Sequence, residues 1–268
     1  MTLIITAATK DYVFQVADTR LTAVDGTSFS DDQIKSTVAH CKDVKIVLSY
    51  TGIAYITGQR TDLWLVSKLK EFKCWEKVFI EILDLIVREL TTAVSLDANL
   101  AKYGLTFVIA GLGINKFGKD DTAIAMISNC LTPNETTLNF DYSAPSQIFK
   151  KYVLTLQPDF KCYISEHGAG DSNPDIEFLR RKLIKELPHS QSAKALDRIM
   201  FYLVGWLRLQ AKDSKSSNLI SDDCTVTHIG RDYKSSLFFF TKNKKIKRFP
   251  NIVSKDKCIT NLTYNQKT

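Results

Sequence analysis

Residues 2–22 have the sequence TLIITAATKDYVFQVADTRLT. Two apolar runs rich in β-branched and aromatic residues, 3–8 and 12–17, flank the short polar turn 9–11. This pattern predicts an antiparallel β-hairpin that starts immediately after Thr2. Because the second strand returns toward the beginning of the first, the hairpin would bring Asp18 close to the chain start.

The rest of the chain alternates between strand-like and helix-like segments. Runs rich in β-formers predict strands, and apolar residues at three- and four-residue steps predict amphipathic helices. The predicted strands are 45–50, 105–110, 123–127, 225–229 and 237–240, and the predicted helices are 63–69, 79–90, 174–187 and 196–207. Residues 131–146 are polar and turn-rich, which indicates a hairpin or a long loop.

Strands therefore alternate with pairs of helices, which predicts an α+β fold. We expect two stacked antiparallel β-sheets flanked by helix pairs. No linker or repeat divides the sequence, so the expected organisation is a single domain over 1–268, with a basic tail from about residue 242.

The composition is typical of a globular protein. Of 268 residues, 44% are hydrophobic and 24% are charged, which supplies a sizeable core without disulfides. No stretch approaches the roughly 18 apolar residues of a membrane span, and the N-terminus does not have the pattern of a secretory signal. The six cysteines occur singly, as expected of reduced thiols in the cytoplasm. We therefore expect a cytoplasmic protein without membrane contact.

Two further patterns give no specific site. The four histidines are far apart, and neither a dinucleotide fingerprint nor a nucleophile elbow is present, so no metal or cofactor is expected. Part of the net charge of +7 lies in the run KNKKIKR, residues 242–248. Such a run is usually a solvated loop, and no nucleic-acid-binding motif accompanies it, so nucleic acid is not an expected partner.

Thr2 gives the first indication of chemistry. An N-terminal threonine can use its own α-amino group, which titrates near 7.7–8.0, as the base that activates its hydroxyl. Removal of Met1 would expose that amine. A buried Lys35 beside the threonine would lower the pKa of the nucleophile and its amine, with Asp18 as the charge partner of the lysine. The alternative from these residues alone is that Asp18 and Arg20 form a surface ion pair after a strand.

The chain resembles the β subunits of proteasomes and their bacterial relatives at Thr2, at the ADTRLT run 17–22, at Lys35 and at SYTG 49–52. Counted from Thr2, Asp18 and Arg20 fall at the family's spacing without a gap, whereas Lys35 needs about a one-residue insertion. Segments 105–111, 167–170 and 221–226 also look like later strands and turns of the family, so the likeness covers most of the chain.

This resemblance implies the four-layer αββα sandwich of N-terminal nucleophile (Ntn) hydrolases and the activity of a threonine peptidase or amidase. Thr2 would be nucleophile and base, and Lys35 the cation that lowers its pKa. Asp18 would orient the lysine. The backbone N–H of Gly52 would serve the oxyanion hole, which stabilises a tetrahedral intermediate.

The resemblance also assigns roles around this centre. Arg20 would be a supporting ion-pair residue, and Thr22 and Thr51 would border the substrate channel. The implied partners are a peptide or amide substrate and further copies of the chain in a closed homo-oligomer. An ATPase partner is an open question.

Two positions depart from the family pattern. The family has a serine between glycines where this chain has Ala169. Its aspartate before the last long strand has no clear match, and Ser217 or Asn218 falls nearest. Both departures concern groups that hold the threonine amine, which leaves two other classes of function open. One is a non-catalytic, proteasome-like scaffold, and the other is a binding protein that uses the basic segment 242–248.

Overall fold

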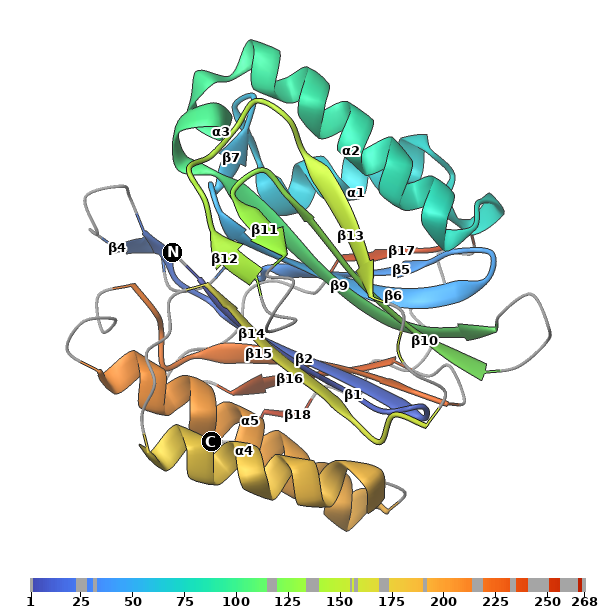
Figure 1. The fold of residues 1–268 in the computed structure, drawn as a ribbon, viewed down its shortest axis with the longest axis vertical. Coiled ribbons are helices and arrows are strands. Elements are labelled where there is room, and N and C mark those ends of the chain that lie inside the picture. The colour runs from blue at the N-terminus through green and yellow to red at the C-terminus, as the bar shows by residue number, and fades with distance from the viewer. Residues whose placement is uncertain are drawn as a thin grey trace.

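The computed structural model describes residues 2–22, 28–30, 33–114, 120–133, 140–154, 156, 159–168, 174–189, 192–213, 219–231, 235–240, 251–255 and 265–266. Within these ranges, two six-stranded β-sheets lie at the centre of the molecule, with helices on the outer side of each sheet (Figure 1).

The first sheet contains the N-terminal hairpin. Its strand order is β14 (Tyr163–Gly168), β1 (Leu3–Ala8), β2 (Tyr12–Asp18), β15 (Cys224–Gly230), β16 (Ser235–Phe240) and β18 (Asn265–Gln266). The second sheet has the order β13 (Lys150–Leu154), β10 (Asp120–Ser128), β9 (Leu105–Ile114), β6 (Val44–Gly52), β5 (Ser36–His40) and β17 (Asn251–Val253).

Helices and short hairpins make up the remaining elements. The helices are α1 (Thr61–Glu71), α2 (Phe79–Leu96), α3 (Ala98–Tyr103), α4 (Pro174–Glu186) and α5 (Ala193–Lys212), with short 3-10 turns at Cys74–Glu76 and Leu187–His189. The short strand pairs are β3 (Leu21–Thr22) with β4 (Ser28–Ser30), β7 (Tyr55–Ile56) with β8 (Gln59–Arg60), and β11 (Leu131–Pro133) with β12 (Phe140–Tyr142).

The hairpin β1–β2 forms as the sequence predicts, with Ile4 opposite Ala17. Both faces of β1 are covered. Leu3 and Ile5 belong to the core cluster that contains α4 and α5, whereas Ile4 packs on Val108 of the second sheet. All six residues of β1 are therefore buried, which explains why this strand is a continuous apolar run rather than an alternating one.

The predicted helices also form, and their apolar faces cover the sheets. Ile82 and Ile86 of α2 share a core cluster with Phe107 of the second sheet. Ile199 and Leu203 of α5 share another with the first sheet. Residues 131–142 contain an antiparallel hairpin, one of the two structures expected there. The predicted α+β class is confirmed.

The prediction of wholly antiparallel sheets is wrong at two edges. β17 pairs in parallel with β5, and β18 pairs in parallel with β16. A tight hairpin forces neighbouring strands to be antiparallel, but a strand that reaches an edge through a long connection is free of that constraint. The C-terminal segment is thus not simply a tail, because parts of it extend both sheets. The basic run 242–248 itself lies outside the described residues.

Sequence patterning did not predict β5, β13 and β14. β13 and β14 lie at sheet edges, where no residue of either strand is fully buried. An edge strand with little burial lacks the apolar alternation that marks a strand in sequence. β14 is the neighbour of β1, so this omission concerns the surroundings of Thr2.

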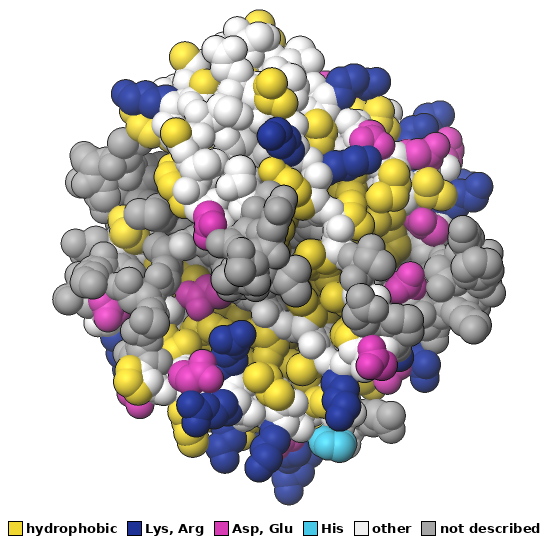
Figure 2. Space-filling view, in the orientation of Figure 1, with side chains coloured by type: hydrophobic (Ala, Val, Ile, Leu, Met, Phe, Trp, Pro, Cys, Tyr) yellow, Lys and Arg dark blue, Asp and Glu magenta, His cyan; other side chains and the backbone are white. Residues whose placement is uncertain are grey.

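The face shown in Figure 2 carries lysine and arginine side chains at its lower end, over α4. No helix within the described ranges is long and apolar enough to cross a membrane. Cys41, Cys74, Cys130, Cys162 and Cys224 are free thiols, and Cys258 lies outside the described residues.

Candidate active site

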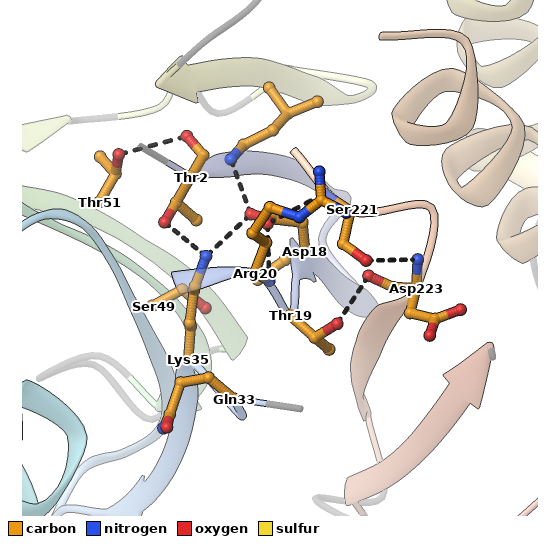
Figure 3. Close-up of polar contacts among 12 residues, drawn as sticks. Thr2, Asp18, Thr19, Arg20, Gln33, Lys35, Ser49, Thr51, Ser221 and Asp223 are labelled. Carbon is orange, nitrogen blue, oxygen red and sulfur yellow. Dashed lines mark hydrogen bonds and ion pairs between the residues drawn. The ribbon is translucent and has the colours of Figure 1, made fainter. Parts of the chain in front are cut away.

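Lys35 and Thr2 are in direct contact although the whole β1–β2 hairpin and the β3–β4 strand pair lie between them in the sequence. Thr2 precedes β1 and is buried, with 3% of its surface exposed. Lys35 immediately precedes β5, and its Nζ donates a hydrogen bond of 2.7 Å to Thr2 Oγ1 (Figure 3). The structure therefore places an ammonium group on the hydroxyl that the sequence marks as the nucleophile.

Asp18 neutralises this buried cation. Its Oδ1 lies 3.1 Å from Lys35 Nζ, and neither side chain has any exposed surface. The carboxylate also accepts main-chain N–H bonds from Leu3 at 3.0 Å, Arg20 at 3.0 Å and Ser221 at 3.4 Å. A buried charge is costly unless it is paired and hydrogen-bonded, and both conditions are met here. The alternative of a surface ion pair at Asp18 is wrong.

The loop that carries Lys35 is held against the end of β2. Gln33 N donates to Thr19 O at 3.0 Å, which fixes the chain just ahead of Lys35. Thr19 is held in turn by Asp223, whose carbonyl accepts hydrogen bonds of 3.1 Å from both Thr19 N and Thr19 Oγ1. The lysine therefore reaches Thr2 from a segment that is anchored at Thr19, the residue after Asp18.

Ser221 is part of this support, and the sequence did not reveal its role. Its N–H reaches Asp18, and its Oγ accepts a hydrogen bond of 3.1 Å from Asp223 N. The segment 221–226 resembles later strands and turns of the family, and no role at Thr2 or Asp18 was expected from it. The contact to Asp18 is made by the main chain, and any residue type has such an N–H group.

A buried polar network ties the two sheets together behind this site. Gln15 Nε2 donates to Thr6 Oγ1 and to Val108 O, both at 3.2 Å. Ser49 Oγ donates to Gln15 Oε1 at 2.5 Å and lies 2.7 Å from Ser36 Oγ. Ser36 follows Lys35 directly, so the network fixes the strand that begins at the lysine relative to β1 and β2. A glutamine in an otherwise apolar strand was the sequence signal that could have identified it.

Two glycines pack closely around the chain start. Gly168 has φ +109°, and a Cβ atom there would lie 1.7 Å from Thr2 O. Gly52 ends β6 with φ +108°, and a Cβ there would lie 2.4 Å from Gly104 O. Both positions therefore require glycine. Thr51, next to Gly52, donates from Oγ1 to Thr2 O at 3.2 Å.

The remaining residues of the expected set are placed less completely. Arg20 contributes its main-chain N–H to Asp18, and its side chain is half-buried. Thr22 lies in the short strand β3, and its side chain is outside the described residues. Ala169, Ser217 and Asn218, where the chain departs from the family pattern, are also outside them.

A cavity of about 500 Å³ lies beside these residues. Thr51 and Gly168, which contact the main chain of Thr2, form part of its wall together with Gly52. The cavity is also lined by His167 on β14, where burial lowers the imidazole pKa to about 4. This histidine is therefore neutral at pH 7. Within the described ranges, no cluster of three or more histidine, cysteine or acidic residues could hold a metal ion.

Comparison with solved structures finds proteins that are similar to this chain. The Anbu (Gly-1) mutant from Hyphomicrobium sp. strain MC1 aligns with a TM-score of 0.51 and 12% identity over 92% of this chain and 87% of its own. Anbu (ancestral beta-subunit) from Yersinia bercovieri aligns with a TM-score of 0.47 and 10% identity, over 87% of this chain and 82% of the Yersinia chain. Eukaryotic HslV from Trypanosoma brucei aligns with a TM-score of 0.41 and 14% identity, over 85% of this chain and 99% of the HslV chain.

No family model matches the sequence, and a search of curated proteins finds no match. The first structural match shows that this chain shares the Anbu fold. The resemblance to the proteasome-like Ntn hydrolases is thereby confirmed at the level of the fold.

Proposed function

We propose that this chain, with the fold of an Anbu subunit, is an N-terminal threonine hydrolase that cleaves peptide or amide bonds. The observation that carries the proposal is the position of Lys35 Nζ, 2.7 Å from Thr2 Oγ1 and 3.1 Å from Asp18 Oδ1. The Lys35–Asp18 pair has no exposed surface, and burying two charges costs desolvation free energy. Activation of the Thr2 hydroxyl would explain why the protein keeps such a pair at this position.

The reaction begins with removal of Met1, which frees the α-amino group of Thr2. That amine takes the proton of Oγ1 as the oxygen attacks the substrate carbonyl carbon. The Lys35 ammonium keeps the pKa of the threonine amine low through like-charge repulsion and stabilises negative charge on Oγ1. The proton then passes to the leaving amine, which departs and leaves an ester on Thr2. Water hydrolyses the ester by the same route in reverse.

The oxyanion of each tetrahedral intermediate needs a preorganised donor, and Gly52 N–H is the proposed one. Gly52 ends β6 directly after Thr51, whose hydroxyl touches Thr2. Arg20 supports the site through the Asp18 carboxylate. Thr22 and Thr51 border the substrate channel in this proposal.

The finer architecture belongs to the same proposal. The two sheets with helices on their outer sides are the four-layer αββα sandwich of Ntn hydrolases, and residues 1–268 form one domain of that type. Copies of the chain assemble into a closed homo-oligomer, since closed symmetry is a common way to confine such a site.

Labelling with a β-lactone probe, which acylates activated hydroxyl groups, tests this function. Digestion and mass spectrometry locate the adduct, which we expect on Thr2 of chains that have lost Met1. Thr2→Ala should abolish labelling and Thr2→Ser should retain it. Thr92→Ala is the matched control, because Thr92 lies on α2 and bonds to its own helix at Arg88 O.

An absence of adduct on Thr2 in chains that lack Met1 would overturn the hydrolase. Full retention of Met1 would also overturn the hydrolase, because the nitrogen of Thr2 would then belong to a peptide bond and could not act as a base. Either result would favour the scaffold class left open by the sequence.

A further inference from the structure

The strand that begins after Lys35 is paired on both sides. β5 lies between β6 and β17 in the second sheet, and it starts at Ser36, the residue that follows Lys35. β17 pairs in parallel with β5, with Ile252 opposite Val38. An edge strand presents a row of N–H and C=O groups to which another extended segment can bond. β17, from the C-terminal part of the chain, therefore covers the edge that β5 would otherwise present.

β17 is anchored in the core by one side chain. Val253 is 1% exposed and belongs to the same core cluster as Leu65 and Leu69 of α1. The strand contacts both α1 and β5, and Figure 1 shows it next to β5 and below α1. The residues on either side of Val253 are half-buried, and Lys255 is exposed. Val253 is therefore the apolar anchor of a strand that joins α1 to β5.

A polar contact sets the register of β17. Asn251 Nδ2 donates a hydrogen bond of 3.3 Å to Asp62 Oδ2 in the first turn of α1. Asp62 is 2% exposed, and its carboxylate is held by Arg60, whose Nε donates to Oδ1 at 3.0 Å. A slip of one residue would turn Val253 away from the core and take Asn251 away from Asp62. The edge of β5 and the start of α1 thus recognise this segment by an amide and an apolar side chain two positions apart.

A displacement of β5 would be transmitted to the active site. Lys35 is held on one side by the bond from Gln33 N to Thr19 O, and on the other side it continues directly into β5. Its Nζ must reach both Thr2 Oγ1 at 2.7 Å and Asp18 Oδ1 at 3.1 Å. A misplacement of about 1 Å at a catalytic group can lower a rate about 100-fold. Loosening β5 can therefore impair the lysine without unfolding the sheet.

We propose that β17 is a C-terminal latch that positions Lys35, with Asn251 and Val253 as its positioning residues. The inference rests on the proposed hydrolase function, to which it adds control by a segment far from Thr2 in the sequence. While the latch is paired with β5, the lysine stays at Thr2. When the latch is released, both sheets stay folded, the lysine leaves Thr2 and acylation falls.

Variants of the full chain that expel β17 test the latch. Val253→Asp places a carboxylate in the apolar core, where it has no partner. Asn251→Asp is isosteric and places a carboxylate against that of Asp62. Asp62→Asn combined with Asn251→Asp sets one amide against one carboxylate again and should restore the latch. Lys255→Asp is the matched control, because it introduces the same side chain at an exposed position directly after β17.

The position of Lys35 is measured first, without turnover. Amide hydrogen exchange and acetylation by an N-hydroxysuccinimide ester are both located by mass spectrometry. In Val253→Asp and Asn251→Asp, exchange in β5 should rise at least about 10-fold, the mark of local opening, while exchange in β9 stays unchanged. Lys35, which has no exposed side-chain surface in the unchanged protein, should become acetylated. The exposed Lys42 is the internal reference and should react equally in all variants.

Two results of this measurement would overturn the latch. One is a protected Lys35 with slow exchange of β5 in both variants. The other is exchange in Asn251→Asp that rises as much in β9 as in β5, because the strand would then support the whole fold rather than the lysine.

Acylation is measured separately, with the β-lactone probe as a function of pH. Labelling of Thr2 should fall at least about 10-fold in Asn251→Asp and return in the combined variant. Its pH midpoint should move upward, because the threonine amine holds its proton more tightly once the Lys35 ammonium moves away. A simple loss of folded protein would lower labelling without moving the midpoint.

The latch and the hydrolase can fail separately. A midpoint that stays in place in Asn251→Asp would refute the positioning role and leave the hydrolase intact. Absence of labelling in the unchanged protein would sink the hydrolase, and acetylation of Lys35 in the variants would still show that β17 holds it in place.

Discussion

Replacing Lys35 with alanine should abolish acylation of Thr2 and lower the stability of the fold by a limited amount. The variant removes the 2.7 Å contact to Thr2 Oγ1 and the partner of a carboxylate without exposed surface. Breaking a buried pair usually costs about 3–5 kcal/mol. Asp18 keeps its main-chain N–H bonds from Leu3, Arg20 and Ser221, so we expect a value near the lower end, about 3 kcal/mol.

This loss should lower the melting temperature by about 6–12 °C, since 1 kcal/mol corresponds to about 2–4 °C in a domain near this size. Hydrolysis should fall by more than about 100-fold, the lower end of what positioned acid–base groups contribute. Lys35→Arg should keep the charge but also fail, because a planar guanidinium cannot replace a compact ammonium in the tight space between Thr2 and Asp18.

The assay combines β-lactone labelling, peptide hydrolysis and melting curves for both variants. Lys42→Ala is the control, because Lys42 is exposed in the turn between β5 and β6, at the opposite end of β5 from Lys35. A folded Lys35→Ala protein without labelling supports the reasoning. Near-normal activity in both Lys35→Ala and Lys35→Arg would show that the catalytic role of the lysine is misassigned.

Four further results are expected. Intact-mass measurement of active protein should show loss of Met1, and active protein that retains it in full would contradict the proposed base. Light scattering at micromolar concentration should give the mass of a closed homo-oligomer, and an active monomer would refute assembly. Gly168→Ala should lower the free energy of unfolding by about 1–3 kcal/mol and end labelling of Thr2, because φ is +109° and the added Cβ collides with Thr2 O; the control Gly58→Ala, with φ +79° and no atom within 4 Å, should keep labelling. His167 has a folded-state pKa of about 4 against 6.5 ordinarily, so its contribution to stability is complete above pH 6.5 and is lost as pH falls toward 4; urea unfolding at pH 7 and 4.5 should show a smaller loss in His167→Asn than in the unchanged chain.

The sequence pattern predicted those helices and strands whose buried faces produce a regular spacing of apolar residues. The apolar residues of α2 and α5 repeat at helical spacing because one face of each helix covers a sheet. β13 and β14 were missed because they are edge strands in which no residue is fully buried, so neither carries a regular apolar pattern. The parallel pairing of β17 and β18 could not be predicted, because the direction of an edge strand depends on the path of the preceding connection rather than on its few residues.

The N-terminal sequence by itself determined that Thr2 and Asp18 would be close, because a tight hairpin fixes the register of its two strands. It also offered Lys35 as the candidate cation, but no local rule places that lysine beside Thr2. The tertiary structure decided that Lys35 Nζ reaches Thr2 Oγ1 at a sequence separation of 33 and that Ser221 N–H reaches Asp18 at a separation of 203. The cavity, too, exists only in the folded chain, since its wall combines the ends of β6 and β14 with the β11–β12 hairpin. The Lys35 contact and the cavity depend on how the two sheets pack face to face, and the Ser221 contact depends on the pairing of β15 with β2. Neither arrangement can be derived from one short segment of the sequence.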